Sequence, residues 1–161
     1  MDARSSLRFL SGVHTPRGIM SEPASDSNER IAIILKSDAY EDVLLALSFA
    51  GIAASANIDV AMFVTNRAAR LMRTGGLAEF NPVDRVGAEF MSGAEEMGFR
   101  DLGRMLREIK GTGRLRVYLC SRGARIWDIG PGQMLDEVDS IMGTAGFLLE
   151  EVRRAATVLT I

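Results

Sequence analysis

The single cysteine, Cys120, is the residue of this chain whose type and position most suggest chemistry. It ends the strand-like run RLRVYLC (114–120), and the sequence SRGAR after it favours a short helix or turn. Backbone N–H groups at the start of a helix stabilise an anion, and Arg122 and Arg125 add positive charge within a turn. Both effects lower the pKa of a thiol and favour the nucleophilic thiolate. The alternative is a small core residue, because free cysteine is among the most buried residue types.

Other polar residues come at the ends of predicted strands, where the binding sites of open α/β sheets lie. Ser37 follows the first predicted strand, Asn66 follows the second, and Thr144 lies in the turn MGTAG before the last helix. Together with Arg122 and Arg125, these residues are candidates for binding an anion or a small donor molecule. The competing interpretation is solvated surface charge for the arginines and simple close packing for the turn.

Several common catalytic and cofactor sites are not supported by the residues present. The only histidine, His14, lies in the N-terminal segment, which argues against a Cys–His pair or a zinc site. There is no CxxC motif, and a strand instead of a helix follows GTGRLR (111–116), so neither a thioredoxin-like dithiol nor a phosphate loop is predicted. We therefore expect no cofactor and no bound metal.

The 161 residues have the composition of a soluble globular protein, with 47% hydrophobic and 25% charged residues. The net charge of −2 gives no reason to expect nucleic acid as a partner. One cysteine cannot form an internal disulfide, so a cytoplasmic location is expected, and no apolar run reaches the ~18 residues that span a bilayer. Residues 1–28 lack periodicity and are predicted to form a flexible tail before a single domain, 29–161. The arginines and serines of this tail also loosely resemble a transit peptide.

Strand-like and helix-like segments alternate through that domain. The predicted strands are 30–37, 58–65, 114–120, 139–143 and 157–161. The predicted helices and helical turns are 39–56, 66–76, 99–113, 133–138 and 144–156. This order predicts an α/β fold, a three-layer α/β/α sandwich with a mostly parallel five-stranded sheet.

Three details of this assignment involve particular residues. Asp38 and Glu41 fit a capping box at the start of the first helix, and Thr144 fits the cap of the last. Within the segment 74–113, residues 77–97 are expected to form one or two short helices that lie over the sheet or cover a partner subunit. A mobile lid is the alternative for this stretch.

Three stretches together resemble the DsrE/DsrF-like family of sulfur-relay proteins. RIAIILKSDAYEDVLLALSFAGIAASANIDVAMFVT (30–65) is similar to the family's opening strand, alanine-rich helix and second strand. RLRVYLCSRGA (114–124) resembles its strand–cysteine–helix signature, and VDSIMGTAGFLLEEVRRAATVLTI (138–161) resembles its closing segment. The 74–113 insert resembles the larger members. The resemblance implies that Cys120 is the sulfur-carrying cysteine and that the protein assembles as a homo-oligomer, a trimer or hexamer.

The leading hypothesis is a sulfurtransferase-like carrier. The Cys120 thiolate accepts sulfane sulfur from a persulfidated protein or from thiosulfate, and passes it to an acceptor protein. The alternative is a non-catalytic oligomeric binding or scaffold module in which Cys120 is buried. A redox sensor is a weaker reading, because no second cysteine is present to resolve a sulfenic acid. An exposed sulfur near a basic cleft favours the carrier, and a sulfur sealed under the last helix favours the module.

Overall fold

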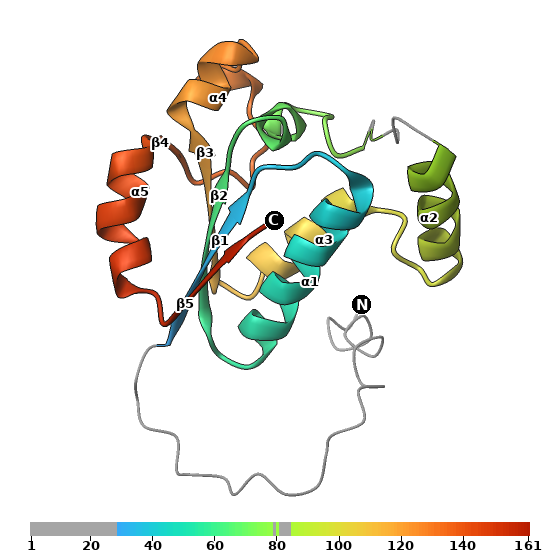
Figure 1. Ribbon diagram of the computed structural model, residues 1–161, viewed down its shortest axis with the longest axis horizontal. Coiled ribbons are helices and arrows are strands. Elements are labelled where there is room, and N and C mark those ends of the chain that lie inside the picture. The colour runs from blue at the N-terminus through green and yellow to red at the C-terminus, as the bar shows by residue number, and fades with distance from the viewer. Residues whose placement is uncertain (1–28, 79, 81–84) are drawn as a thin grey trace, which may run out of the picture.

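A parallel β-sheet forms the centre of the structure (Figure 1). The structure is a computed structural model, and it describes residues 29–78, 80 and 85–161. Within these residues the sheet has five strands, in the order β4-β3-β2-β1-β5, and every strand runs parallel to its neighbours. The strands are β1 (Arg30–Leu35), β2 (Asp59–Val64), β3 (Leu115–Cys120), β4 (Ser140–Met142) and β5 (Thr157–Thr160). The predicted α/β fold with its five strands is therefore confirmed, and the sheet is parallel throughout.

Helices cover both faces of the sheet. The helices α1 (Tyr40–Ser55) and α3 (Leu102–Lys110) lie on one face, and α5 (Thr144–Glu150) lies on the other with the 3-10 turn η4 (Val152–Arg154) (Figure 1). Above the carboxyl ends of the strands lie α4 (Ser121–Ile126) and the 3-10 turn η2 (Ala68–Met72). The predicted three-layer arrangement is confirmed.

The two faces of the sheet have cores of different size. On β3, Leu115, Val117 and Leu119 point into a large core under α1 and α3. The small alanines of α1 let that helix lie close to the strands: Ala46, Ala50, Ala53 and Ala54 are all buried. Since successive side chains of a strand alternate between faces, Tyr118 and Cys120 belong to a smaller core under α5.

The smaller core depends on one residue of α5. Phe147 is the buried residue of that helix, and its ring stacks on Phe63 with 4.6 Å between the centroids. Tyr118 meets Phe147 edge-on at 5.9 Å. Aromatic pairs of this kind add about 0.5–1.5 kcal/mol each beyond their buried area. This cluster therefore anchors α5 on the sheet and sets the position of the residues at its start.

The predicted capping box at Asp38 is wrong. The N-cap of α1 is Ala39, and no side chain caps that end. The Asp38 carboxylate is buried and instead accepts from Arg70 Nε at 2.6 Å and pairs with Arg67 Nε at 3.2 Å. Two arginines some thirty residues further along the chain compete successfully with the local backbone for this carboxylate.

The predicted cap at Thr144 is also wrong, because Gly143 is the N-cap of α5 and Thr144 is its first residue. The helix predicted over 144–156 ends at Glu150 and is followed by the separate turn η4. The helical turn predicted at 133–138 lies earlier, at η3 (Pro131–Gln133), because Met134 forms a β-bridge with Arg73.

The segment 77–97 contains α2 (Arg85–Glu96), which does not lie over the sheet as expected. It lies beyond α1 in Figure 1, and Phe90 contacts the Tyr40 ring edge-on at 6.3 Å. Residues 79 and 81–84 lie outside the described part of the chain, as does the predicted tail 1–28. The roles of this segment as a lid or a subunit contact stay predictions.

Candidate functional site

Cys120 lies where β3 turns directly into α4. It is the last residue of the strand and the N-cap of the helix, with φ −58° and ψ 125°. Gly123, in the first turn of α4, makes this junction possible. A Cβ atom at Gly123 would lie 2.7 Å from the Cβ of Ala69 in η2, closer than two carbon atoms can approach. Glycine therefore lets α4 pack tightly on η2 and holds the Cys120 turn in place.

Four hydrogen-bond donors surround the Cys120 sulfur. They are the Thr65 hydroxyl, the backbone N–H groups of Gly123 and Arg122, and the Thr144 hydroxyl. Burial of the thiol raises its pKa, and the four hydrogen bonds lower it. The hydrogen bonds prevail, so the pKa of Cys120 lies below the ordinary value of a thiol. The site thus favours the thiolate in a place where burial alone would favour the neutral thiol.

The sulfur is nevertheless covered, because Cys120 is only 2% exposed. The cover is the start of α5. Thr144, which is exposed, donates to the sulfur, and a Cβ atom at the preceding Gly143 would come within 3.9 Å of the Ser121 hydroxyl oxygen. Cys120 therefore lies one side chain below the surface, beneath the first turn of the last helix.

The structure brings some of the other candidate residues to this sulfur and leaves others apart. Thr144 reaches it with its hydroxyl, and Arg122 reaches it with its backbone N–H. Ser37 instead accepts from the Ala39 backbone N–H at 3.2 Å. The Asn66 backbone, with φ +49°, accepts a hydrogen bond from the Trp127 indole at 2.9 Å. In their described contacts, Ser37 shapes its own turn, and the Asn66 backbone joins its turn to Trp127.

Thr65 is a site residue that the strand-end rule indicates beside Asn66, although it is not among the candidate anion-binding residues. The signal was present, because Thr65 immediately follows β2, and β2 lies beside β3. The pairing of Val64 with Leu119 places the next residue of each strand, Thr65 and Cys120, at the same edge. Of the two residues that the rule indicates at this strand end, Thr65 is the one whose side chain reaches the sulfur.

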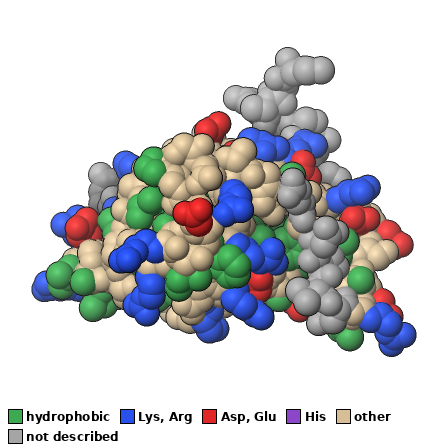
Figure 2. All heavy atoms as spheres, turned by 90° about the horizontal axis from the view of Figure 1, so that it is seen from above, with side chains coloured by type: hydrophobic (Ala, Val, Ile, Leu, Met, Phe, Trp, Pro, Cys, Tyr) green, Lys and Arg blue, Asp and Glu red, His purple; other side chains and the backbone are tan. Residues whose placement is uncertain are grey.

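Several arginines lie on or beside η2 and α4, and Figure 2 shows Lys and Arg side chains across the face seen from above. Arg67 and Arg70 share the Asp38 carboxylate, and Arg73 donates to the Trp127 carbonyl at 2.5 Å. Arg122 and Arg125 are exposed on α4, and no ion pair joins either of them to another described residue. The surface beside Cys120 therefore presents two guanidinium groups that are free to meet an anion.

The match of residues 29–161 to the model of the DsrE/DsrF-like family decides the assignment. The chain belongs to this family. The family is associated with sulfur relay, and the match spans both the Cys120 turn and the closing helix that covers it. The resemblance noted in the sequence is thereby confirmed.

A solved structure supports the fold of this DsrE-family chain. The structure of this chain is similar to the solved structure of MTH1491, a protein of unknown function from Methanobacterium thermoautotrophicum, with a TM-score of 0.53 and 12% identity. The alignment covers 83% of this chain and 99% of the other. No curated protein matches the chain.

Two kinds of feature are absent from the described residues of the DsrE-family domain. Among them, no helix combines the length and the apolar character needed to cross a membrane. The same residues contain no group of three or more histidine, cysteine, aspartate or glutamate side chains arranged to hold a metal ion.

Proposed function

We propose that this DsrE-family protein carries sulfane sulfur on Cys120 as a persulfide. The observation that carries the proposal is the convergence of four hydrogen-bond donors on one sulfur atom. A thiol is a weak acceptor, so a cysteine that only fills space in a core has no need of such donors. A thiolate accepts hydrogen bonds strongly, and the thiolate is the form that attacks sulfur.

The loading step is thiol exchange. The Cys120 thiolate attacks the outer sulfur of a donor persulfide, R–S–SH, and the bond between the donor's two sulfurs breaks. The donor leaves as the thiolate R–S⁻ with the electron pair of that bond, and Cys120–S–SH forms. With thiosulfate, the leaving group is sulfite. No net oxidation occurs, so one cysteine is sufficient.

The unloading step reverses the roles. A thiolate of the acceptor protein attacks the outer sulfur of Cys120–S–SH, and the Cys120 thiolate leaves. Hydrogen bonds from Thr65 and Thr144 that stabilise the thiolate also make it a better leaving group. The same four donors therefore serve both steps.

Access to the sulfur requires the first turn of α5 to move, because that turn covers Cys120. The helix has seven residues, and Phe147 is its buried contact with the sheet. A short helix held by one aromatic cluster opens at lower cost than the central strands. We propose that donor and acceptor reach Cys120 through this opening.

The exposed Arg122 and Arg125 would hold an anionic donor such as thiosulfate, or acidic groups of a partner protein, beside the opening. Ser37 and Asn66 remain predicted members of this anion site. A homo-oligomer is also part of the proposal, since α1 exposes Leu45, Phe49 and Ile52 along one side. A cytoplasmic location would supply the reducing conditions that keep Cys120 free.

The burial of Cys120 favours a second candidate function, a non-catalytic binding or scaffold module. Intact mass after incubation with thiosulfate or a persulfidated donor, without reductant, distinguishes the two. The carrier gains one sulfur atom (about 32 Da) that dithiothreitol removes, and the Cys120→Ser variant gains nothing. If the folded wild-type protein gains no sulfur from any donor, and its thiol reacts with iodoacetamide only after unfolding, the module is the better account.

A further inference from the structure

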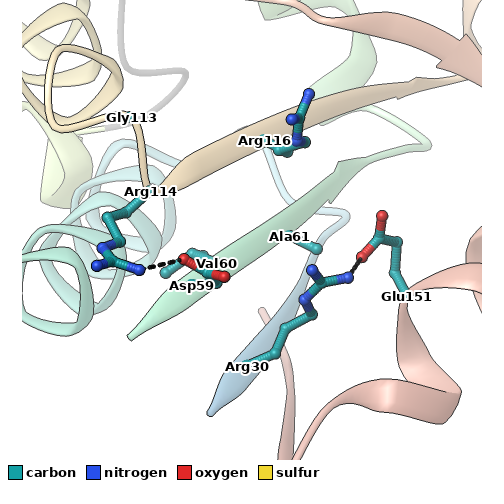
Figure 3. A pocket seen from close by; sticks show the side chains of 8 residues that line it. All are labelled: Arg30, Asp59, Val60, Ala61, Gly113, Arg114, Arg116 and Glu151. Carbon is teal, nitrogen blue, oxygen red and sulfur yellow. Dashed lines mark hydrogen bonds and ion pairs between the residues drawn. The ribbon is translucent and has the colours of Figure 1, made fainter. Parts of the chain in front are cut away.

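A second polar site lies at the opposite edge of the sheet from Cys120. It is a pocket of about 140 Å³ at the amino-terminal ends of β1, β2 and β3 (Figure 3). Arg116 lines it from β3, on the same face of that strand as Cys120. Four residues of strand, at about 3.3 Å each, put the two sites roughly 13 Å apart. The pocket is therefore separate from the sulfur chemistry.

The pocket exists because small side chains occupy one row of the sheet. The strand register aligns Ala32, Ala61 and Arg116 across β1, β2 and β3. The next row contains Phe63 and Tyr118, which Phe147 covers. No described aromatic ring lies over the alanine row, although Ala32 and Ala61 are themselves buried, and Ala61 lines the pocket together with Arg116 (Figure 3).

Two ion pairs form opposite walls of the pocket. Arg30 donates to one oxygen of Glu151 at 2.5 Å, and the Tyr118 hydroxyl donates to the other at 2.6 Å. Arg114 donates to Asp59 at 2.9 Å (Figure 3). Glu151 is buried, with 7% of it exposed, and each of its two carboxylate oxygens already accepts one of these hydrogen bonds.

Arg116 is the arginine of this pocket that forms no ion pair with a described residue. Three arginines and two carboxylates line the pocket, and neither carboxylate pairs with Arg116. The nearby Asp139 is held by Lys110 at 2.7 Å and by the Val117 backbone N–H. Within the described residues no acceptor is found for the Arg116 guanidinium. The pocket therefore carries one unit of positive charge in excess.

We propose that this pocket binds a small oxyanion, with Arg116 as its principal contact. A guanidinium presents paired N–H donors that match two oxygens of a phosphate or carboxylate group. The unused N–H groups of Arg30 and Arg114 flank the same space. The pocket volume of about 140 Å³ is several times the space that one water molecule needs, so a phosphate or carboxylate group fits in it.

The test is a titration with inorganic phosphate, and separately with acetate, at constant ionic strength. Binding is followed by nuclear magnetic resonance at the Arg116 side-chain N–H and the Ala61 amide, and by thermal unfolding. We expect saturable shifts at both positions and a raised Tm for wild type. Arg116→Gln should weaken binding at least tenfold, while Arg85→Gln, which removes an exposed arginine of α2, should leave it unchanged.

A second variant tests the shape of the pocket without changing its charge. Ala61→Val fills the floor and should also weaken binding at least tenfold, with circular dichroism confirming that the protein is folded. The proposal is overturned if the anion shifts residues of α4 and not Ala61, or if all variants bind equally. It is also overturned if Arg116→Gln dissociates an oligomer in sedimentation while no anion binds, since the pocket is then a contact between copies. Binding by Cys120→Ser protein shows that this site stands or falls independently of persulfide formation.

Discussion

Replacing Phe147 by alanine should open the cover over Cys120. The Phe147 side chain is 2% exposed and contacts the rings of Phe63 and Tyr118. Loss of a buried phenylalanine costs about 3–5 kcal/mol. The lower end applies here, because α5 is a short surface helix that can settle into part of the space. We therefore expect about 3 kcal/mol of lost stability.

The same loss should increase the reactivity of Cys120. If α5 must leave the sheet before a reagent reaches the sulfur, its opening equilibrium changes by the free energy that Phe147 contributes. Every 1.4 kcal/mol is a factor of ten, so about 3 kcal/mol predicts roughly a hundredfold faster alkylation. The assay is the rate of iodoacetamide addition to the folded protein, followed by intact mass under conditions where unfolding is negligible.

Leu148→Ala is the matched control. Leu148 is the next residue of the same helix and is 52% exposed, so its loss should change neither stability nor alkylation by much. The reasoning is refuted if Phe147→Ala lowers the free energy of unfolding as expected while the alkylation rate of the folded protein stays at the wild-type value. The sulfur would then be reached by a route that does not involve α5.

Three further predictions concern the thiol and its turn. Thr144→Val removes a donor and should raise the pKa of Cys120, measured by thiolate ultraviolet absorbance against Cys120→Ser, whereas Thr144→Ser should restore the wild-type pKa; equal values in all three would contradict the site description. Because the folded pKa is lowered, the unfolded chain binds more protons between the two values, so the stability of wild type relative to Cys120→Ser should rise with pH through that window. This stability difference should stay constant above the unfolded pKa of about 8.5. If urea unfolding shows that the difference falls as the pH rises through the window, the folded pKa is raised and the site description is contradicted. Gly123→Ala should destabilise the protein by about 1–3 kcal/mol, since its Cβ would meet that of Ala69 at 2.7 Å, and an unchanged urea midpoint would show that α4 can shift freely.

The sheet could be predicted from the sequence because its strands are locally encoded. Runs such as 30–37 and 58–65 are mostly apolar and rich in β-branched residues over the length of a strand, and the intervening segments are long enough for parallel crossovers. The strand-end rule then placed Cys120 at the correct edge. These features depend on short stretches and on a general rule of topology.

The parts that could not be predicted depend on contacts between distant residues. Asp38 has a local pattern typical of a cap, yet its carboxylate pairs with Arg67 and Arg70. The burial of Cys120 results from a turn at Thr144, which only the folded chain brings above β3. The polar pocket likewise joins Glu151 to Arg30, 121 residues apart in sequence. Local patterns cannot predict which distant partner will reach a buried group.

The central claim, that Cys120 carries transferable sulfur, is tested most directly on the peptide that contains it. Trypsin cleavage after Arg116 and Arg122 releases VYLCSR, with Cys120 as its only sulfur-bearing residue. After loading of the folded protein and trapping with iodoacetamide, we predict that this peptide carries one extra sulfur. The extra sulfur should disappear when an acceptor thiol is added before trapping. A peptide that carries only the alkyl group, from protein that was folded and exposed to donor, would contradict the account.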